Sequence, residues 1–245
     1  MSSNCHIRET QRWATGTAIL RSGWKGLYIF AALLPASAAS ASDDGQIWLA
    51  SSAVVRLGEK WRLSADSVAR FSDDRDGLYE VEMNLLLGYR IAEKVTLWAG
   101  YTHNPTYNAG DFAVMEHRGR QQVTFDNVAK IGRGRLSARL RTEERWRDGV
   151  DGTAFRVRPY VNYSLPLGRN SRSALVLSHE SFFDLNKSNF QRVRGEERMR
   201  NLVAVTTPLT KKIAVEIGYL HQHGFRPGAD DSNDHVASLS LAASF

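Results

Sequence analysis

The chain has 245 residues, of which 42% are hydrophobic, 24% charged and 10% aromatic. This composition excludes a disordered tail protein, is too polar for a bundle of membrane helices, and at this length favours a single domain. The formal net charge is +6, but half of the surplus lies in residues 1–41, so the charge gives no argument for nucleic-acid binding.

The N-terminal part of the chain has the order of an export signal. Arg21 and Lys25 precede an apolar run at residues 27–34, and a tract of small residues follows at 36–41. A charged region, a short apolar region and an A-x-A site are typical of a secretory signal peptide. The run is too short to span a bilayer as a helix, which takes about 20 residues. A buried helix would not explain the small residues that follow.

We therefore predict cleavage after Ala41, with Ala38 as the alternative site. Residues 1–20 lie upstream of an ordinary charged region, so they are either an extended leader or the product of a start codon placed too early. The only cysteine is Cys5, so the mature chain has no thiol. This excludes a disulfide framework, a zinc–cysteine site and a cysteine nucleophile.

The rest of the chain is dominated by segments of about ten to twelve residues in which apolar and polar side chains alternate, and no segment carries a helical apolar stripe. Period two is the pattern of β-strands. We predict eleven strands, at residues 46–56, 61–71, 79–91, 95–104, 115–126, 135–146, 153–164, 173–184, 191–206, 213–223 and 235–245.

The predicted connections alternate between short turns and longer segments that carry Gly, Asp and Asn. Short turns at one end and longer loops at the other are the plan of an outer-membrane β-barrel. The short turns lie at residues 58–60, 92–94 and 210–212, and the longer segments at 72–77, 105–114, 147–152 and 225–234.

Both ends of a bacterial barrel chain normally face the periplasm, which requires an even number of strands. Eleven segments are therefore one too many or one too few. Either the segment at 46–56 lies outside the wall, which leaves ten strands, or a twelfth strand exists, for which residues 103–116 are the place to look.

Charge placement separates a barrel from a soluble sandwich. The polar faces of the predicted strands hold fifteen arginines and eight acids, whereas a water-facing sheet favours Lys, Thr, Ser and Glu. Arginine suits an enclosed polar lumen, because its planar fork bridges carboxylates. The apolar face would then meet lipid. That face also carries aromatic residues suited to interfacial girdles: Trp61, Tyr79, Tyr89, Tyr101, Trp146, Tyr163, Tyr219 and Phe245.

The first candidate site is the set of charged residues that alternation turns toward the lumen. They predict either a basic pore that favours anions or a salt-bridge ladder that plugs a narrow barrel. Eight acids neutralise only part of fifteen arginines, so water or a small anion is expected to reach the rest. In a conducting lumen, the arginines from Arg139 onward would set the anion preference. The predicted lining residues are Arg118, Arg120, Arg139, Arg141, Arg156, Arg158, Arg198, Arg200, Glu116, Glu143, Glu180 and Glu196.

A second candidate is the sequence His179-Glu180-Ser181, which invites comparison with outer-membrane lipid enzymes that use a histidine and a serine. On a strand, His179 and Ser181 share one face while Glu180 points to the other. The three consecutive residues therefore cannot form a local catalytic triad. We expect Glu180 to pair with an arginine inside.

Metal sites are a weaker possibility. His221 and His223 lie two apart on one strand face, but no carboxylate shares that face between them, and an interfacial position explains them equally. The acidic loops at 73–77 and 230–234 could bind calcium or bridge lipopolysaccharide phosphates. Asp and Asn are also ordinary loop residues. We therefore predict no metal and no cofactor.

The last segment is the most specific feature of the chain. It alternates apolar residues, Ala237, Leu239, Leu241 and Ala243, and ends on an aromatic residue, Phe245. This is the arrangement that outer-membrane barrels present to their assembly machinery. With the export signal and the alternation throughout, it predicts a barrel in the outer membrane of a Gram-negative bacterium.

Short stretches in a particular order resemble the domain-of-unknown-function 2490 family of predicted outer-membrane barrels. The resemblance covers essentially all of residues 46–245 and implies a fold and a location, without an activity or a catalytic residue to transfer. The matching stretches are residues 46–48, 116–118, 121–122, 135–141, 143–145, 163–167, 179–183, Arg198, 218–220 and 235–236.

We expect residues 42–245 to form a closed antiparallel outer-membrane barrel of ten to twelve strands, without enzymatic activity, that acts as a narrow channel or a structural barrel. Signatures of soluble enzymes, such as a P-loop or G-x-S-x-G, are absent. Expected partners are outer-membrane lipid, lipopolysaccharide, the assembly machinery through Phe245, and a small anion, with no nucleic acid. The alternatives are a lipid acyl hydrolase or acyltransferase, and a periplasmic β-sandwich or lipid-carrier protein.

Overall fold

A computed structural model describes residues 43–245, and the predicted signal peptide lies outside them. The described residues form eleven strands and no helix, which confirms the all-β prediction. In this part of the chain no helix is long and apolar enough to cross a membrane. The strands are β1 (Asp43–Arg56), β2 (Trp61–Ser72), β3 (Gly77–Ala92), β4 (Val95–Asn108), β5 (Asp111–Ile131), β6 (Gly134–Arg147), β7 (Val150–Pro166), β8 (Ala174–Asp184), β9 (Gly195–Pro208), β10 (Ile213–Gly224) and β11 (Ser232–Ser244).

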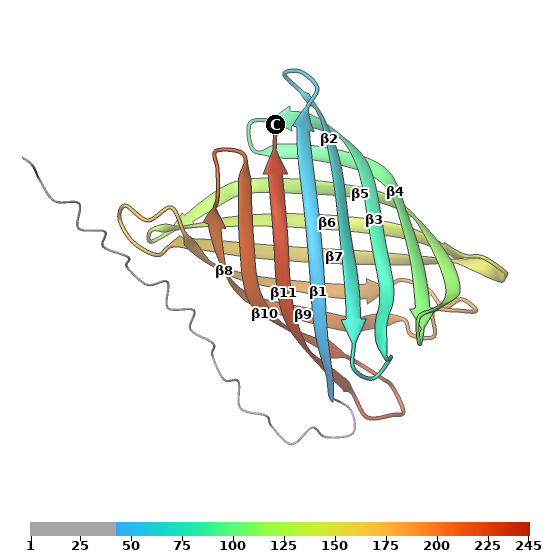
Figure 1. Cartoon of the computed structure of the whole chain (residues 1–245). Coiled ribbons are helices and arrows are strands. Elements are labelled where there is room, and N and C mark those ends of the chain that lie inside the picture. The colour runs from blue at the N-terminus through green and yellow to red at the C-terminus, as the bar shows by residue number, and fades with distance from the viewer. Residues whose placement is uncertain (1–42) are drawn as a thin grey trace, which may run out of the picture. The chain divides into compact units, whose positions relative to one another are not determined.

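The strands close into a barrel in which each strand pairs with its neighbours in sequence and β1 pairs with β11 (Figure 1). Consecutive strands are antiparallel, whereas β1 and β11 run parallel, with Asp43 beside Asn233 and Val54 beside Ser244. The Phe245 N–H donates to the carbonyl of Val54 at 2.9 Å and extends this seam. Closure leaves no unpaired strand edge.

The expectation of an even strand number is wrong, because all eleven predicted segments are strands of the wall. Residues 46–56 belong to β1, and residues 103–116 hold no additional strand but the end of β4 and the start of β5. The parallel β1–β11 pair accommodates the odd number, since first and last strands then run in the same direction. As a result, Asp43 and Phe245 lie at opposite ends of the barrel.

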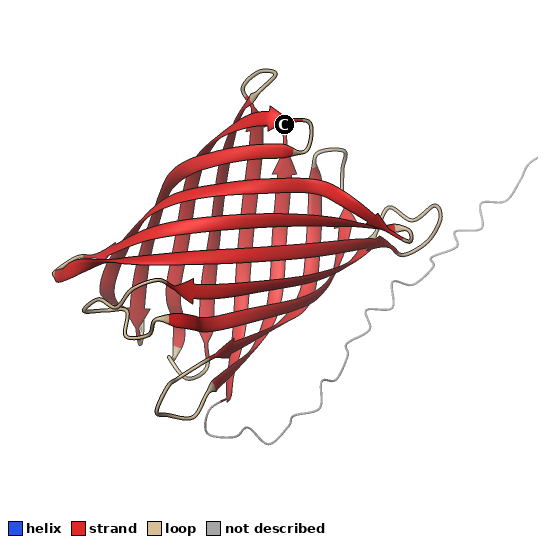
Figure 2. Cartoon of the chain, turned by 180° about the vertical axis from the view of Figure 1, so that it is seen from behind, coloured by secondary structure: helices blue, strands red, loops and turns tan. Residues whose placement is uncertain are grey.

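The connections at the two ends of the barrel overlap in length, and the longest lies at the end next to Asp43 (Figure 2). We call this the loop end, and we call the opposite end, next to Phe245, the turn end. The loop end carries residues 73–76, 109–110, 148–149, 185–194 and 225–231, and the turn end carries 57–60, 93–94, 132–133, 167–173 and 209–212.

Two connections predicted to be long are two-residue turns. Residues 105–114 and 147–152 are mostly strand, and the chain reverses at 109–110 and at 148–149. The φ angles of Gly110 and Gly149 are 85° and 71°, a backbone conformation that glycine adopts without steric cost. The strands therefore extend further toward the loop end than the alternation predicts.

Alternation separates two chemically different faces of the wall. The outer face exposes large apolar side chains, among them Leu85 at 53%, Val203 at 51% and Ile217 at 62%. The inner face buries charged side chains, and those of Arg120 and Glu143 have no exposed surface. The barrel is thus polar inside and largely apolar outside.

Tyr79 is an exception to the predicted faces. Alternation predicts it on the apolar outer face, but the register of β2 and β3 shifts between Arg70 and Phe71. The shift is a β-bulge that turns Tyr79 inward, where it is 6% exposed and its hydroxyl donates to Gln46 Oε1 at 2.8 Å.

Candidate functional site

A chain of ion pairs links strands β3, β5, β6, β7 and β8 inside the barrel. Arg120 contacts Glu82 Oε1 at 2.5 Å and Glu143 Oε1 at 3.1 Å. Arg158 contacts the same Glu143 oxygen at 2.7 Å and donates to Glu180 Oε2 at 3.0 Å. Each guanidinium therefore bridges two carboxylates, the arrangement for which arginine is suited. We call this set, with the pairs that extend it, the interior network.

The interior network continues toward the loop end through Glu116. This carboxylate accepts from Arg118 Nε at 2.7 Å, Arg145 Nε at 2.9 Å and Arg147 Nε at 2.7 Å. Arg118 also contacts Glu82 at 3.2 Å, which joins the two parts of the network. Because their partners come from several strands, these side chains hold the wall together from within.

Two arginines of the interior are not matched by a close carboxylate. Arg141 donates to Gln122 Oε1 at 2.9 Å, and its ion pair with Glu143 is long, at 4.0 Å. Arg200 takes part in none of the ion pairs found within residues 43–245. Its Nε donates to Gln222 Oε1 at 2.7 Å, and its Cζ lies 4.6 Å from the centre of the Trp48 ring. These two residues leave positive charge in excess.

Eleven of the twelve predicted lining residues take part in the interior network or lie beside it. Arg139 pairs with Glu180, and Arg198 pairs with Glu197 at 2.9 Å. The buried residues of this set are Arg118, Arg120, Arg141, Arg156, Arg158, Glu116, Glu143 and Glu180, and the half-buried ones are Arg139, Arg198 and Arg200.

Glu196 is the predicted residue that the structure places elsewhere. It pairs in register with Phe183, and a bulge in β9 puts its neighbour Glu197 inside, 3.1 Å from Arg156. Strict alternation cannot anticipate a bulge, because the extra residue changes which side chains face inward. The predicted strand also begins too early, since residues 191–194 belong to the connection between β8 and β9.

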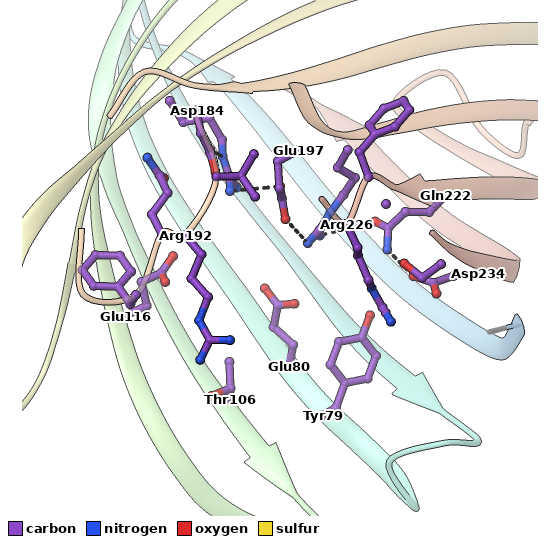
Figure 3. A pocket seen from close by; sticks show the side chains of 18 of the residues that line it. Tyr79, Glu80, Thr106, Glu116, Asp184, Arg192, Glu197, Gln222, Arg226 and Asp234 are labelled. Atoms are coloured by element: carbon purple, nitrogen blue, oxygen red, sulfur yellow. Dashed lines mark hydrogen bonds and ion pairs between the residues drawn. The ribbon is translucent and has the colours of Figure 1, made fainter. Parts of the chain in front are cut away.

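A polar cavity of about 670 Å³ opens at the loop end (Figure 3). Its lining includes eight arginines and seven carboxylates, so its formal charge is nearly balanced. Glu80, Glu116 and Arg118 line it and also belong to the ion-paired interior, so the cavity ends on the interior network. We call it the vestibule.

The outer face of β8–β11 carries a row of polar residues that register brings together. His179 pairs with Asn201, Asn201 with His221, and His221 with His235. The next row toward the turn end begins with Leu177 and is apolar. The polar row therefore marks the boundary of the apolar band on this side of the barrel.

His179 makes two hydrogen bonds within and beside this row. Its Nε2 lies 3.1 Å from Ser181 Oγ and its Nδ1 lies 2.8 Å from Asn201 Oδ1. Glu180 faces the other way and pairs with Arg158 and Arg139 inside, as the alternation predicts. Sequence reasoning missed Asn201, which is 22 residues away; the register of β8 and β9 is the signal that would have found it.

The histidines of β10 and the acidic loops are not gathered into a cluster of metal ligands. Within residues 43–245, no group of three His, Cys, Asp or Glu side chains could hold a metal ion. His223 pairs with Asp231 at 3.1 Å. A hydrogen bond from the Arg226 backbone N–H, together with the bond from His223, lowers the pKa of Asp231. This acidic loop is thus held by its own neighbours.

Comparison with known proteins places the chain in a family. The family model described as "Protein of unknown function (DUF2490)" matches residues 45–233. An uncharacterized protein of Methylorubrum extorquens is 24% identical over 200 residues, covering 81% of this chain and 87% of that protein. No solved structure matches. The chain therefore belongs to the DUF2490 family.

Proposed function

We propose that the protein is an exported outer-membrane barrel whose lumen is closed by the interior network, so that it acts as a structural wall and not as an open pore. The observation that carries the proposal is the contrast between the two faces of every strand. The outside is apolar, and the inside is charged, buried and paired. The bilayer and the lumen are the environments that suit these faces.

The outer face supports a place in lipid. Exposing many large apolar side chains to water costs about 25 cal/mol per Å² of apolar surface. Leu85 lies on β3, and Val203 and Ile217 lie on the adjacent strands β9 and β10; each exposes at least half of its surface. A continuous apolar belt of this kind exceeds the patches that monomeric soluble proteins tolerate. A periplasmic carrier would also place its apolar face inside.

The inner face supports closure. A solute that crossed the middle of the barrel would have to separate Arg120 from Glu143 and Arg158 from Glu180, whose side chains are less than 10% exposed. Breaking a buried pair costs about 3–5 kcal/mol when one partner is left uncompensated. Several such pairs lie side by side, so passive opening is unfavourable.

The ends of the barrel support an orientation. Phe245 lies at the turn end, where it would meet the assembly machinery from the periplasmic side. The longest connection, the ten residues 185–194, lies at the other end. In outer-membrane barrels the longer loops face outward, so the vestibule would open to the cell exterior, among lipopolysaccharide headgroups.

A second candidate is a narrow pore that favours small anions. It is favoured by Arg141 and Arg200, whose charge the nearby carboxylates do not balance. If the barrel conducts, we expect replacement of Arg141 and Arg158 by glutamate to shift the ion preference toward cations. An unchanged reversal potential in a conducting double variant would exclude this candidate.

Extraction of the protein from cells tests the proposal. We expect it to stay with the outer-membrane fraction through urea and carbonate washes, to require detergent for release, and to migrate differently on gels before and after heating. Release of folded protein into a detergent-free periplasmic extract would contradict the proposal and favour a soluble carrier.

A further inference from the structure

We propose that His179, Ser181 and Asn201 form a serine-hydrolase triad on the outer face of the barrel, acting on an acyl ester of a membrane lipid. Ser181 is the nucleophile, His179 is the general base, and Asn201 is the positioning residue that orients the imidazole. The substrate class rests on the proposed membrane location, whereas the serine chemistry does not.

The three side chains form an unbroken hydrogen-bonded chain across two strands. His179 Nε2 lies 3.1 Å from Ser181 Oγ, and His179 Nδ1 lies 2.8 Å from Asn201 Oδ1. Both distances fall within the range expected for a nucleophile, its base and the group that orients the base. The serine and histidine share a face because they are two residues apart on β8, and register puts Asn201 directly beside His179.

One neutral tautomer of His179 satisfies both hydrogen bonds. The Asn201 carbonyl oxygen can only accept, so Nδ1 carries the hydrogen and donates it. Nε2 is then unprotonated and accepts from the Ser181 hydroxyl. This is the protonation state that a general base needs before it removes the serine proton.

The surroundings distinguish His179 from other histidines of the outer face. His117 bonds to the Tyr101 hydroxyl and to Asp148, and His235 bonds to the Tyr219 hydroxyl. Tyrosine pairs of this kind are expected of an interfacial girdle. Among residues 43–245, the bond from His179 is the one that joins a histidine to a serine hydroxyl.

The backbone beside Ser181 departs from a regular sheet on both sides. The register of β7 and β8 sets Pro159 opposite Ser181, where the paired positions are interrupted, because proline has no N–H for the ladder. On the other side, the register of β8 and β9 shifts between Phe182 and Phe183. Bulges are frequent next to active sites, where they re-aim side chains.

The depth of the triad suits a lipid ester. His179 and Asn201 lie in the polar row, and Ser181 lies one row further toward the loop end, beside Met199. The row on the turn-end side consists of Leu177, Val203, Tyr219 and Ala237. The triad therefore lies where the apolar band gives way to polar side chains. The acyl esters of membrane lipids lie at the same boundary, between headgroup and acyl chain.

The reaction needs only water as the second substrate. Ser181 Oγ attacks the ester carbonyl carbon while His179 Nε2 takes the hydroxyl proton. The carbon–oxygen bond to the lipid alcohol then breaks, and the alcohol leaves with that proton. Water gives a proton to His179 and adds to the acyl-serine; the serine recovers the proton, and a fatty acid is released.

Covalent labelling tests the serine chemistry without a choice of lipid. The full chain, folded in detergent, is treated with a water-soluble fluorophosphonate, and mass spectrometry finds the modified residue. We expect label on Ser181, none on Ser181→Ala, and a rate at least about 100-fold lower for His179→Ala. Asn201→Ala should slow labelling and shift its pH profile, and Asn201→Asp should restore it.

His117→Ala is the matched control, because His117 is also an outer-face histidine with two hydrogen-bond partners. It should label at the wild-type rate. Absence of label on folded wild-type protein would overturn the proposal, as would equal labelling of Ser181→Ala or an equal loss in His117→Ala. Heat-dependent gel migration verifies that each variant is folded.

Two lipid arms then identify the ester. Unlabelled wild-type protein that reacts with the fluorophosphonate is incubated in mixed micelles with phosphatidylethanolamine or with lipopolysaccharide, and released fatty acid is measured by mass spectrometry. Release from one arm that is lost in Ser181→Ala identifies the source. Labelling without release from either arm would overturn the lipid substrate, and the extraction experiment above separately tests the membrane location.

Discussion

The two faces of β8 make the clearest comparison in the molecule, because three consecutive residues serve them in turn. Glu180 points inward, is buried, and is held by Arg158 and Arg139. His179 and Ser181 lie on the outer face, where His179 bonds to both Ser181 and Asn201. The carboxylate of Glu180 is held in ion pairs that link the strands of the wall. His179 and Ser181 take part in no ion pair among residues 43–245 and make only hydrogen bonds. Because side chains alternate along β8, the residue that stabilises the wall and the residues proposed to react lie on opposite faces of one strand.

The inner and outer faces also differ in how many partners each polar side chain has. Inside, one carboxylate serves two or three arginines, as Glu143 and Glu116 do, so the loss of one group affects several strands. Outside, polar side chains bond in small local sets. We expect substitutions inside to change stability strongly, and substitutions outside to change it little.

The largest stability effect should follow from Glu143→Gln. It removes the carboxylate that Arg120 and Arg158 share, so each keeps one partner and the buried network is left with one uncompensated positive charge, which costs about 3–5 kcal/mol. Urea unfolding of protein in lipid vesicles measures the change. Asp148→Asn, at an exposed outer pair with His117, is the control and should change stability by less than about 1 kcal/mol. Equal effects of the two variants would refute the comparison.

Double-mutant cycles sharpen the comparison between neighbouring residues. The Arg158–Glu180 pair inside should show a coupling energy of about 1–3 kcal/mol in the unfolding free energy. The His179–Asn201 pair outside should show about 1 kcal/mol or less, the net worth of one ordinary hydrogen bond. A larger coupling outside than inside would reverse the assignment of the two faces.

The smallest effect concerns pH at the loop end. The Arg226 backbone N–H and His223 hold the pKa of Asp231 below its ordinary value. This local stability is present above the unfolded pKa and is lost as pH falls through the folded one. The hydrogen-exchange protection of the Arg226 amide should therefore decrease in acid. Asp231→Asn should abolish that dependence, and a variant that kept it would disprove the assignment.

Features that depend on one strand were predictable from the sequence, and features that depend on two strands were not. Period two located all eleven strands and turned Glu143 and Glu180 inward, because side-chain direction is a local property of the extended backbone. The bulges that turn Tyr79 and Glu197 inward are properties of a strand pair. So are the partnership of His179 with Asn201 and the parallel seam between β1 and β11.

Single-channel conductance of refolded protein in planar bilayers tests the central claim most directly. The interior network predicts a folded barrel that changes gel migration on heating and shows no steady conductance under a KCl gradient. Steady openings of the wild-type protein would contradict a closed lumen. An anion-selective reversal potential would then favour the second candidate function, a pore whose ion preference is set by the interior arginines.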